Sequence, residues 1–212
     1  FNKPNLIFAK YGIPGDIRLS AMAAKNIVKS PVSEPLYAPC ASCHGANGEG
    51  NQKLGAPRLA GQNKWYIERQ LRNWQKGIRG THPEDLYGMQ MRPMSMTLAD
   101  EQAISDISVY VNSLQGPVSA TTLEGDVTAG KASYMVCVSC HGANGEGNKD
   151  LNAPKLSGIQ DWYIVRQLQH FKKGIRGANP KDTYGMQMRP MSMTLPDEKA
   201  MKNVAAYIST FK

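Results

Sequence analysis

The chain has 212 residues, with 25 basic against 17 acidic side chains and a formal net charge of +8. This length accommodates one or two small domains. No run of about 20 apolar residues occurs, so we expect no membrane-spanning segment. The chain begins at Phe1 rather than Met, as it would after removal of a signal peptide, although no such peptide is visible in the sequence.

Residues 1–32 have no counterpart elsewhere in the chain. Their opening is irregular, and Asp16 is then placed to cap a short helix that reaches Ile27. The segment carries a charge of +4, half of the chain's excess, from Lys3, Lys10, Arg18, Lys25 and Lys29 against Asp16. It also holds many apolar residues, so we predict an ordered arm that packs its apolar side on the first domain and turns basic side chains outward. Docking to a partner or to a membrane surface is the alternative to a purely structural cover.

The motif Cys-x-x-Cys-His occurs twice, and each copy is followed by Gly-Ala-Asn-Gly-Glu-Gly. It is the attachment sequence of a c-type haem. The two thiols bond covalently to the vinyl groups of one porphyrin, and the histidine becomes the proximal ligand of the iron. The residues concerned are Cys40, Cys43 and His44, and then Cys137, Cys140 and His141.

Half of a zinc site and a thioredoxin-like redox pair are the other interpretations of Cys-x-x-Cys. A zinc site needs further ligands, and the two motifs already use all four cysteines of the chain. A redox pair belongs in a βαβ context, and no strand-rich pattern surrounds either copy. The sequence therefore predicts two covalently attached haem c groups, each with its iron.

The first haem motif and everything after it form a tandem repeat with a constant offset of 97 residues. Between 40–110 and 137–207, 45 of 71 positions are identical and no insertion is needed. Such a close match indicates a duplicated domain. We therefore predict two domains after the N-terminal extension, 33–116 and 126–212, joined by a linker at 117–125 that is rich in turn-forming residues.

Each copy reads as helices joined by long loops. From Trp65 to Trp74, apolar residues recur at positions i, i+4 and i+7 of a helix pattern, and Gly77 ends the helix. The second copy repeats this pattern from Trp162 to Phe171. A helix is therefore expected at the middle of each domain.

Further helices lead into each haem motif and close each domain. Residues 33–40 and Asp126 to Val136 read as lead-in helices, the first with a proline in its first turn, where it is tolerated. The closing helix of the first copy is predicted to begin at Thr97, with Asp100 three residues on as in a capping box. The fold class predicted is all-α. Because domains of about 80 residues build only a small core, we expect the haem to complete it and the haem-free protein to be largely unfolded.

His82 and His170 are poor candidates for the sixth iron position. Their equivalents in the other copy are Asn179 and Asn73, whereas a duplicated site this similar should keep its ligands in both copies. We expect both histidines at the protein surface.

Methionines behave in the opposite way, because four of them recur in both copies. The first copy has Met89, Met91, Met94 and Met96 around Pro93. A methionine stripe is usually gap-filling core, so at most one methionine of each copy is an iron ligand. The proline is predicted to hold this segment extended, as suits a loop laid across a haem face. Spacing alone does not choose among the four.

These motifs resemble those of the cytochrome c4 family, in which two class I cytochrome c domains are joined in tandem. That family carries Cys-x-x-Cys-His, a mid-chain helix preceded by Pro-x-Leu-x-Gly, and a methionine loop. Pro57 to Gly61 and Pro154 to Gly158 match the second of these motifs. The resemblance covers about residues 40–212. Residues 1–32 and the close identity of the two halves depart from the family pattern, and the second departure suggests two haems of similar potential.

The resemblance also implies one iron ligand in each methionine segment. In the family, this ligand lies seven residues before the leucine that opens the last helix. Carried over, the rule implies Met91, before Leu98, and Met188, before Leu195. Each iron is then expected to have one methionine ligand and, from the haem motif, one histidine ligand.

The function implied is electron transport by outer-sphere transfer, in which each iron cycles between ferrous and ferric without exchanging a ligand. Methionine favours ferrous iron and raises the potential relative to ligation by two histidines. We expect an electron carrier rather than an enzyme. One alternative is a haem subunit of a larger periplasmic dehydrogenase or respiratory complex. Another is a dihaem enzyme, such as a peroxidase or a thiosulfate dehydrogenase, which needs an open sixth position on one iron.

Partners and location follow from charge and chemistry. The excess of positive charge predicts redox protein partners with acidic docking surfaces, such as a quinol-oxidising complex and a membrane oxidase or reductase of a respiratory chain. No nucleic-acid partner is expected. Because thioether attachment of haem takes place outside the cytoplasm, we expect the protein in the periplasm.

Four charged or aromatic loop residues recur in both copies and are candidates to hold haem propionates where the two domains meet. They are Arg79, Arg176, Tyr87 and Tyr184. Simple exposure to solvent is the alternative for each of them.

Overall fold

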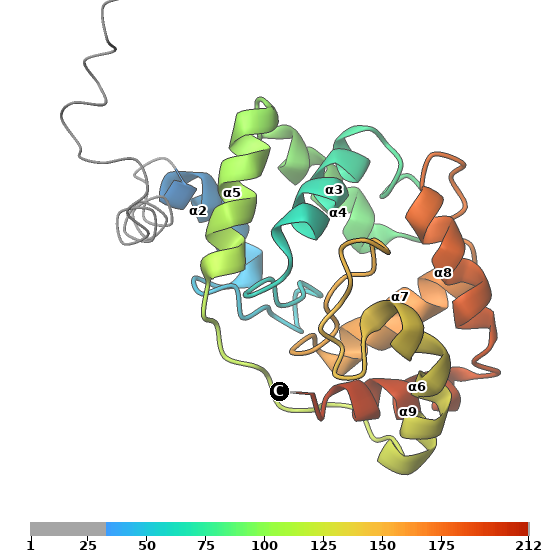
Figure 1. Cartoon of the computed structure of the whole chain (residues 1–212). Helices are drawn as coiled ribbons and strands as arrows, with labels where there is room; N and C mark the ends of the chain where they lie inside the picture. The colour runs from blue at the N-terminus through green and yellow to red at the C-terminus, as the bar shows by residue number, and fades with distance from the viewer. Residues whose placement is uncertain (1–32, 212) are drawn as a thin grey trace, which may run out of the picture.

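The computed structural model describes residues 33–211, so the N-terminal arm, with its expected helix, lies outside the described part of the chain. The described part folds into helices joined by loops (Figure 1), with two isolated bridges and no strand. The all-α prediction is confirmed. The helices are α2 (Ser33–His44), α3 (Lys64–Gln75), α4 (Leu86–Met96), α5 (Glu101–Ser113), α6 (Val127–His141), α7 (Asp161–Lys172), α8 (Thr183–Met193) and α9 (Glu198–Ile208).

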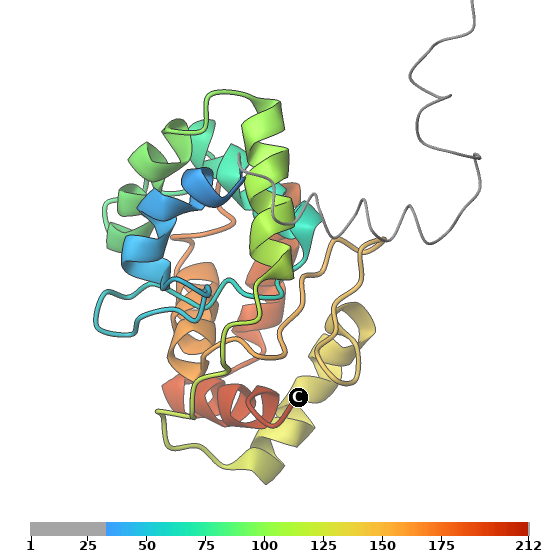
Figure 2. The same cartoon turned by 90° about the vertical axis from the view of Figure 1, so that its left-hand side faces the viewer.

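The helices form two halves that lie against one another (Figures 1 and 2), with α2 to α5 in the first half and α6 to α9, on the right and lower side of Figure 1, in the second. In the first half α5 packs on α2 and α3, and α3 also packs on α4. In the second half α9 packs on α6 and α7, and α7 also packs on α8. The two halves therefore repeat one packing pattern, as the sequence offset predicts. No helix of the described residues is long and apolar enough to cross a membrane.

The mid-domain helices α3 and α7 lie where the apolar pattern predicts them. α3 covers the predicted stretch with one further residue at each end. Gly77 follows it with φ +64°, and Gly174 follows α7 with φ +72°. A glycine takes this left-handed conformation without the steric cost that a Cβ brings. The two helix ends are thus encoded locally.

The closing helix begins later than predicted. α5 starts at Glu101, and Asp100 is its N-cap, with its carboxylate accepting a hydrogen bond from the Ala103 amide at 2.8 Å. Thr97 instead follows α4, and its hydroxyl donates to the Met94 carbonyl. The prediction was wrong because it gave Asp100 the third helical position, whereas a short carboxylate is favoured at the cap itself.

The methionine segment is helical, not extended as predicted. α4 contains Pro93 in its interior, and α8 contains the equivalent proline. Asp85 caps α4 by accepting a hydrogen bond from the Gly88 amide at 3.0 Å. Between cap and proline the residues are mostly good helix formers. The cap and these residues outweigh the preference of proline for an extended neighbour.

Each half has its own small apolar core, and the cores surround a tyrosine of the lead-in helix. Tyr37 is buried and its hydroxyl donates to the Gly45 carbonyl at 2.8 Å. Tyr134 makes the equivalent bond to Gly142 at 2.8 Å. Both bonds fix the helix against the turn that follows the haem motif. The larger members of the first core are Tyr37, Leu98, Ile104, Ile107 and Val111, and those of the second include Tyr134, Ile164, Leu195, Val204 and Ile208.

Candidate haem sites

Each half contains one large, mostly apolar cavity. The first cavity encloses about 1330 Å³ and the second about 1270 Å³, with open space at the mouth included. Their close volumes agree with duplication. The first is lined by Cys40, Cys43, His44, Met91 and Met94, and the second by the equivalent residues Cys137, Cys140, His141, Met188 and Met191. The structure thus brings all eight predicted site residues to two cavities, four to each.

The haem motif lies at the C-terminal end of the lead-in helix. Cys40, Cys43 and His44 occupy positions i, i+3 and i+4 of α2, so they share one face of the helix. Burial raises the pKa of the Cys40 thiol, and burial raises that of Cys137 to about 11. All three groups that a c-type haem needs from its motif therefore face one cavity.

The motif histidine is oriented by a backbone carbonyl. His44 is buried, and its Nδ1 lies 2.7 Å from the Pro57 carbonyl oxygen. Since a carbonyl only accepts, Nδ1 carries the proton and Nε2 keeps the lone pair that a metal binds. Burial lowers the pKa of His44, which also favours the neutral ring. His141 makes the same contact with Pro154 at 2.8 Å.

The structure narrows the choice among the methionines. Met91 and Met94 line the first cavity, three residues apart on α4, whereas Met89 and Met96 do not line it. The second half repeats this division, with Met188 and Met191 at the cavity. Two candidates therefore remain in each half, and the assignment of Met91 and Met188 as iron ligands stays a prediction.

Buried donors without partners belong to residues that line these cavities. Trp74 Nε1 and Arg79 Nε are buried, lie at the first cavity, and have no hydrogen-bond partner among the described residues. Arg176 Nε is likewise buried, belongs to a residue that lines the second cavity, and has no hydrogen-bond partner among the described residues. A buried N–H group normally has an acceptor. The propionates of a haem are acceptors of the required charge, so the donors present suit this group.

Each cavity is completed by side chains of the other half. Arg166 and Tyr163 of α7 line the first cavity, and Arg69 and Tyr66 of α3 line the second. The two sites therefore meet at the interface between the halves.

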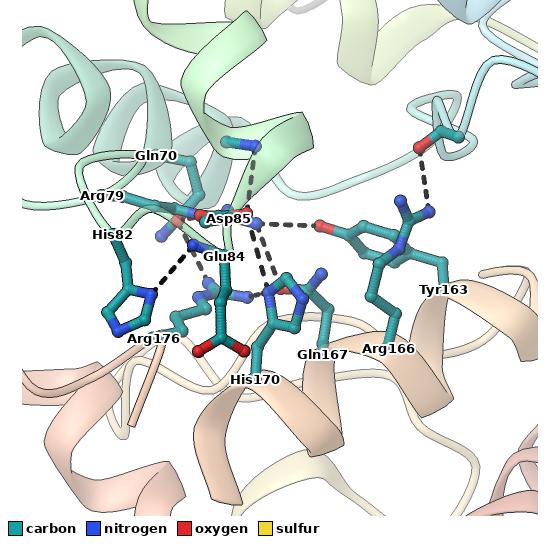
Figure 3. Close-up of polar contacts among 12 residues, drawn as sticks. Gln70, Arg79, His82, Glu84, Asp85, Tyr163, Arg166, Gln167, His170 and Arg176 are labelled. Atoms are coloured by element: carbon teal, nitrogen blue, oxygen red, sulfur yellow. Dashed lines mark hydrogen bonds and ion pairs between the residues drawn. The ribbon is translucent and has the colours of Figure 1, made fainter. Parts of the chain in front are cut away.

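A buried cluster of hydrogen bonds lies at the centre of this interface (Figure 3). Arg79 donates to Gln70 of its own half at 2.9 Å, and to Tyr163 and Gln167 of the other half at 3.3 and 3.1 Å. Arg79 and Gln70 have equivalents 97 residues later, Arg176 and Gln167, which make the corresponding hydrogen bonds. The Arg79 guanidinium also stacks on the ring of Trp74 at 4.4 Å.

Arg176 makes the equivalent set of contacts. It donates to Gln167 at 2.7 Å, to Tyr66 at 2.9 Å and to Gln70 at 3.1 Å. Burial alone would raise the pKa of Tyr66, but Arg176 and Arg79 outweigh it and the pKa is lowered. Arg79 and Arg176, predicted as propionate-binding candidates, thus lie at the domain contact beside both cavities.

Tyr87 and Tyr184, the other two candidates, stay partly exposed and take part in stacking across the interface. The Arg166 guanidinium lies 4.1 Å from the centre of the Tyr87 ring, and Arg69 lies 4.6 Å from that of Tyr184. Arg166 also donates to the Gly55 carbonyl of the first half at 2.9 Å. These cation–π contacts join the halves.

His170 was expected at the surface, and this expectation was wrong. Its side chain is only 13% exposed, lines the first cavity, and places Nδ1 3.6 Å from Asp85 Oδ1 of the other half. The sequence could not reveal this position, because the contact forms only when α7 packs against the first half. His82 is half-buried, and its Nδ1 accepts from the Glu84 amide at 3.2 Å.

Comparison with known proteins agrees with this architecture. A cytochrome c family model matches residues 34–115 and again 127–212. A cytochrome c4 of Stutzerimonas stutzeri is 33% identical over 179 residues, covering 80% of this chain and 82% of its own. A protein described as the thiosulfate dehydrogenase electron acceptor of Stutzerimonas stutzeri (strain A1501) is 29% identical over 189 residues, covering 83% of each chain.

Among solved structures, reduced recombinant cytochrome c4 from Pseudomonas stutzeri is similar, with a TM-score of 0.69 and 27% identity. The match covers 85% of this chain and 97% of that one. Two tandem matches to the family model, two haem motifs and a shared two-domain architecture lead to one assignment. The chain belongs to the cytochrome c family, as a dihaem cytochrome of the cytochrome c4 type with two covalently attached haem c groups.

Proposed function

We propose that this cytochrome is an electron carrier that exchanges single electrons with redox proteins and is not itself an enzyme. The observation that carries the proposal is the equivalence of its two cavities, each with one oriented histidine and two methionines. A dihaem enzyme needs one iron with an open or displaceable ligand position. Both cavities offer an iron the same motif histidine and the same two methionines, and the one further imidazole, His170 of the first cavity, has its Nδ1 3.6 Å from Asp85.

In this proposal each haem would be held by two thioethers, and its iron by one histidine and one methionine. His44 and His141 supply Nε2, with Nδ1 fixed by a proline carbonyl. Met91 and Met188 supply the second ligand. The bound group provides one-electron chemistry at the iron. The protein keeps the ligands in place in both oxidation states, so that little reorganisation accompanies each electron transfer.

We also infer that the interface cluster binds the propionates. Arg79, Arg176 and Trp74 have buried N–H groups that lack acceptors among the described residues. Guanidinium groups bind carboxylates in charge-assisted hydrogen bonds. Propionates held here from both sides would bring the two haem edges close to one another, which favours fast electron exchange inside the molecule.

The partners we propose are redox proteins with acidic docking surfaces, met in the periplasm. The excess of positive charge supports this, because complementary charge speeds association. The relative described as an electron acceptor of thiosulfate dehydrogenase supports delivery of electrons by a dehydrogenase. That relative also keeps a second candidate open, a haem subunit of a larger dehydrogenase or respiratory complex.

Ligand binding to the purified ferrous protein tests the carrier proposal. Carbon monoxide is expected to leave both haem spectra unchanged, since both irons keep two protein ligands. Binding to one haem alone would instead support an enzyme with one open site. The size of the native particle from its source separates the remaining candidates, because a free carrier elutes alone and a subunit elutes with its complex.

A further inference from the structure

The two haem cavities are matched in fixed charge. Leaving histidines, tyrosines and cysteines aside, each cavity is lined by three basic residues and one aspartate. In the first cavity these are Arg58, Arg79, Arg166 and Asp85, and in the second Arg69, Lys155, Arg176 and Asp182. The fixed charge therefore gives no reason for the two haems to differ.

His170 breaks this match. It lines the first cavity, whereas the equivalent residue of the first half, Asn73, does not line the second. Histidine is the side chain that ordinarily changes charge near neutral pH. The first cavity therefore has an ionisable imidazole at a position where the other half of the chain has an amide, which does not titrate.

The geometry connects His170 to the helix that carries the methionines. Its Nδ1 lies 3.6 Å from Asp85 Oδ1, and that oxygen also accepts the hydrogen bond from the Gly88 amide that caps α4. The imidazole is 13% exposed and the Asp85 side chain 5%. His170 is thus shielded enough to interact strongly with nearby charge, yet open enough to exchange a proton with solvent.

Charged groups approach His170 from several elements. Asp85 and Arg79 belong to the first half, Arg166 lies one turn earlier on α7, and Arg176 lies in the loop after α7. Burial lowers the pKa of His170 below its ordinary value, Asp85 opposes this, and the three arginines lower it further. Glu84 and His82 belong to the same loop as Asp85, and the Glu84 amide donates to His82 Nδ1 at 3.2 Å (Figure 3).

We infer that His170 couples proton binding to reduction of the first haem and not of the second. A redox partner donates one electron, ferric iron becomes ferrous, and His170 takes one proton from solvent. Oxidation releases both. The added negative charge favours the imidazolium, and by reciprocity the imidazolium favours the ferrous state. The inference depends on the proposed carrier function, since it adds a proton to the same one-electron step.

The direct test measures the titration of the His170 ring by NMR in fully reduced and fully oxidised holoprotein, from about pH 5 to pH 8. Proton affinity is expected to be higher in the reduced protein by on the order of fivefold or more. Equal affinity in the two states would overturn the inference. It would leave the carrier function intact, because low-spin haems that transfer electrons without proton coupling are still carriers.

Two reciprocal variants identify the haem concerned by redox titration across the same pH range. In the native protein one potential is expected to fall as pH rises, and the other to vary less. His170→Asn should remove that additional dependence. Asn73→His, which places an imidazole at the equivalent position of the other half, should give the second haem a pH dependence of its own. A dependence that survives unchanged in His170→Asn would assign the proton to another group and refute the inference.

Discussion

Gln70 and Gln167 accept hydrogen bonds from the same two arginines. Gln70 Oε1 lies 2.9 Å from Arg79 Nη1 and 3.1 Å from Arg176 Nη2, and Gln167 Oε1 lies 2.7 Å from Arg176 Nη1 and 3.1 Å from Arg79 Nη2. The four side chains therefore form a closed ring of bonds across the interface. Because the arginines are buried, loss of one acceptor leaves donors that water does not easily reach.

Replacing Gln70 by leucine should destabilise the holoprotein. The change keeps the side chain's size and removes the acceptor of two guanidinium groups, with an expected loss of about 1–3 kcal/mol in the free energy of unfolding. Denaturant unfolding followed by circular dichroism measures it. Gln115→Leu is the control, since Gln115 is exposed and, within residues 33–211, its side chain bonds only to the nearby Ser113 carbonyl. Equal stability of the two variants would show that the ring contributes nothing.

Met91→Leu should remove the methionine-to-iron charge-transfer band of one haem and lower the potential of that haem. Met94→Leu is a matched control, since Met94 lies on the same helix and lines the same cavity. Its variant should keep the band. Met188→Leu and Met191→Leu test the second half in the same way. A band lost in Met94→Leu and kept in Met91→Leu would reverse the ligand assignment.

Preventing haem attachment should leave most of the chain unfolded. Each apolar core of the described residues is small, and the cavity beside it is large. Without the group that fills the cavity, the buried area is too small to offset the loss of conformational entropy. A variant with serine at all four cysteines is expected to show little helical circular dichroism and no cooperative thermal transition. Native-like helix content in that variant would contradict this account.

Deleting residues 1–30 should preserve both haem spectra but slow electron exchange with the native partner, most strongly at low salt. This segment carries half of the net positive charge, and salt screens its attraction to acidic surfaces. Stopped-flow rates at several ionic strengths measure the effect, with the full chain as control. An unchanged rate with unchanged salt dependence would make the arm a structural cover only.

The parts of the fold that local sequence determines were predictable. The haem motifs, the offset of 97 residues and the apolar pattern that ends at Gly77 each depend on neighbours along the chain. The domain boundaries at 33–116 and 126–212, with the linker at 117–125, remain predictions in their exact positions. The segment that carries Met91 was wrongly predicted to be extended. The N-cap at Asp85 favours a helix, and this outweighs the preference of Pro93 for an extended preceding residue.

Other features depend on packing between distant segments. The contact of His170 with Asp85 joins residues 85 positions apart, and no periodicity in either segment points to it. The orienting role of Pro57 was equally hidden, because it uses a backbone carbonyl that every residue has. The Pro-x-Leu-x-Gly stretch is recognisable as a family motif from sequence. Its physical role follows from the structure, in which the carbonyl of its proline contacts His44.

Several contacts between the halves are reciprocal. Arg69 bonds to Asn152 of the second half, and the equivalent Arg166 bonds to Gly55 of the first. Likewise the Arg58 amide donates to Gln160, and the Lys155 amide donates to Asn63. Each of these contacts is made once from the first half to the second and once, by the equivalent residues, from the second half to the first. Paired contacts of this kind are typical of the interface of a twofold symmetric dimer. In its geometry the chain therefore resembles a homodimer whose two subunits are joined by a linker and differ in individual residues.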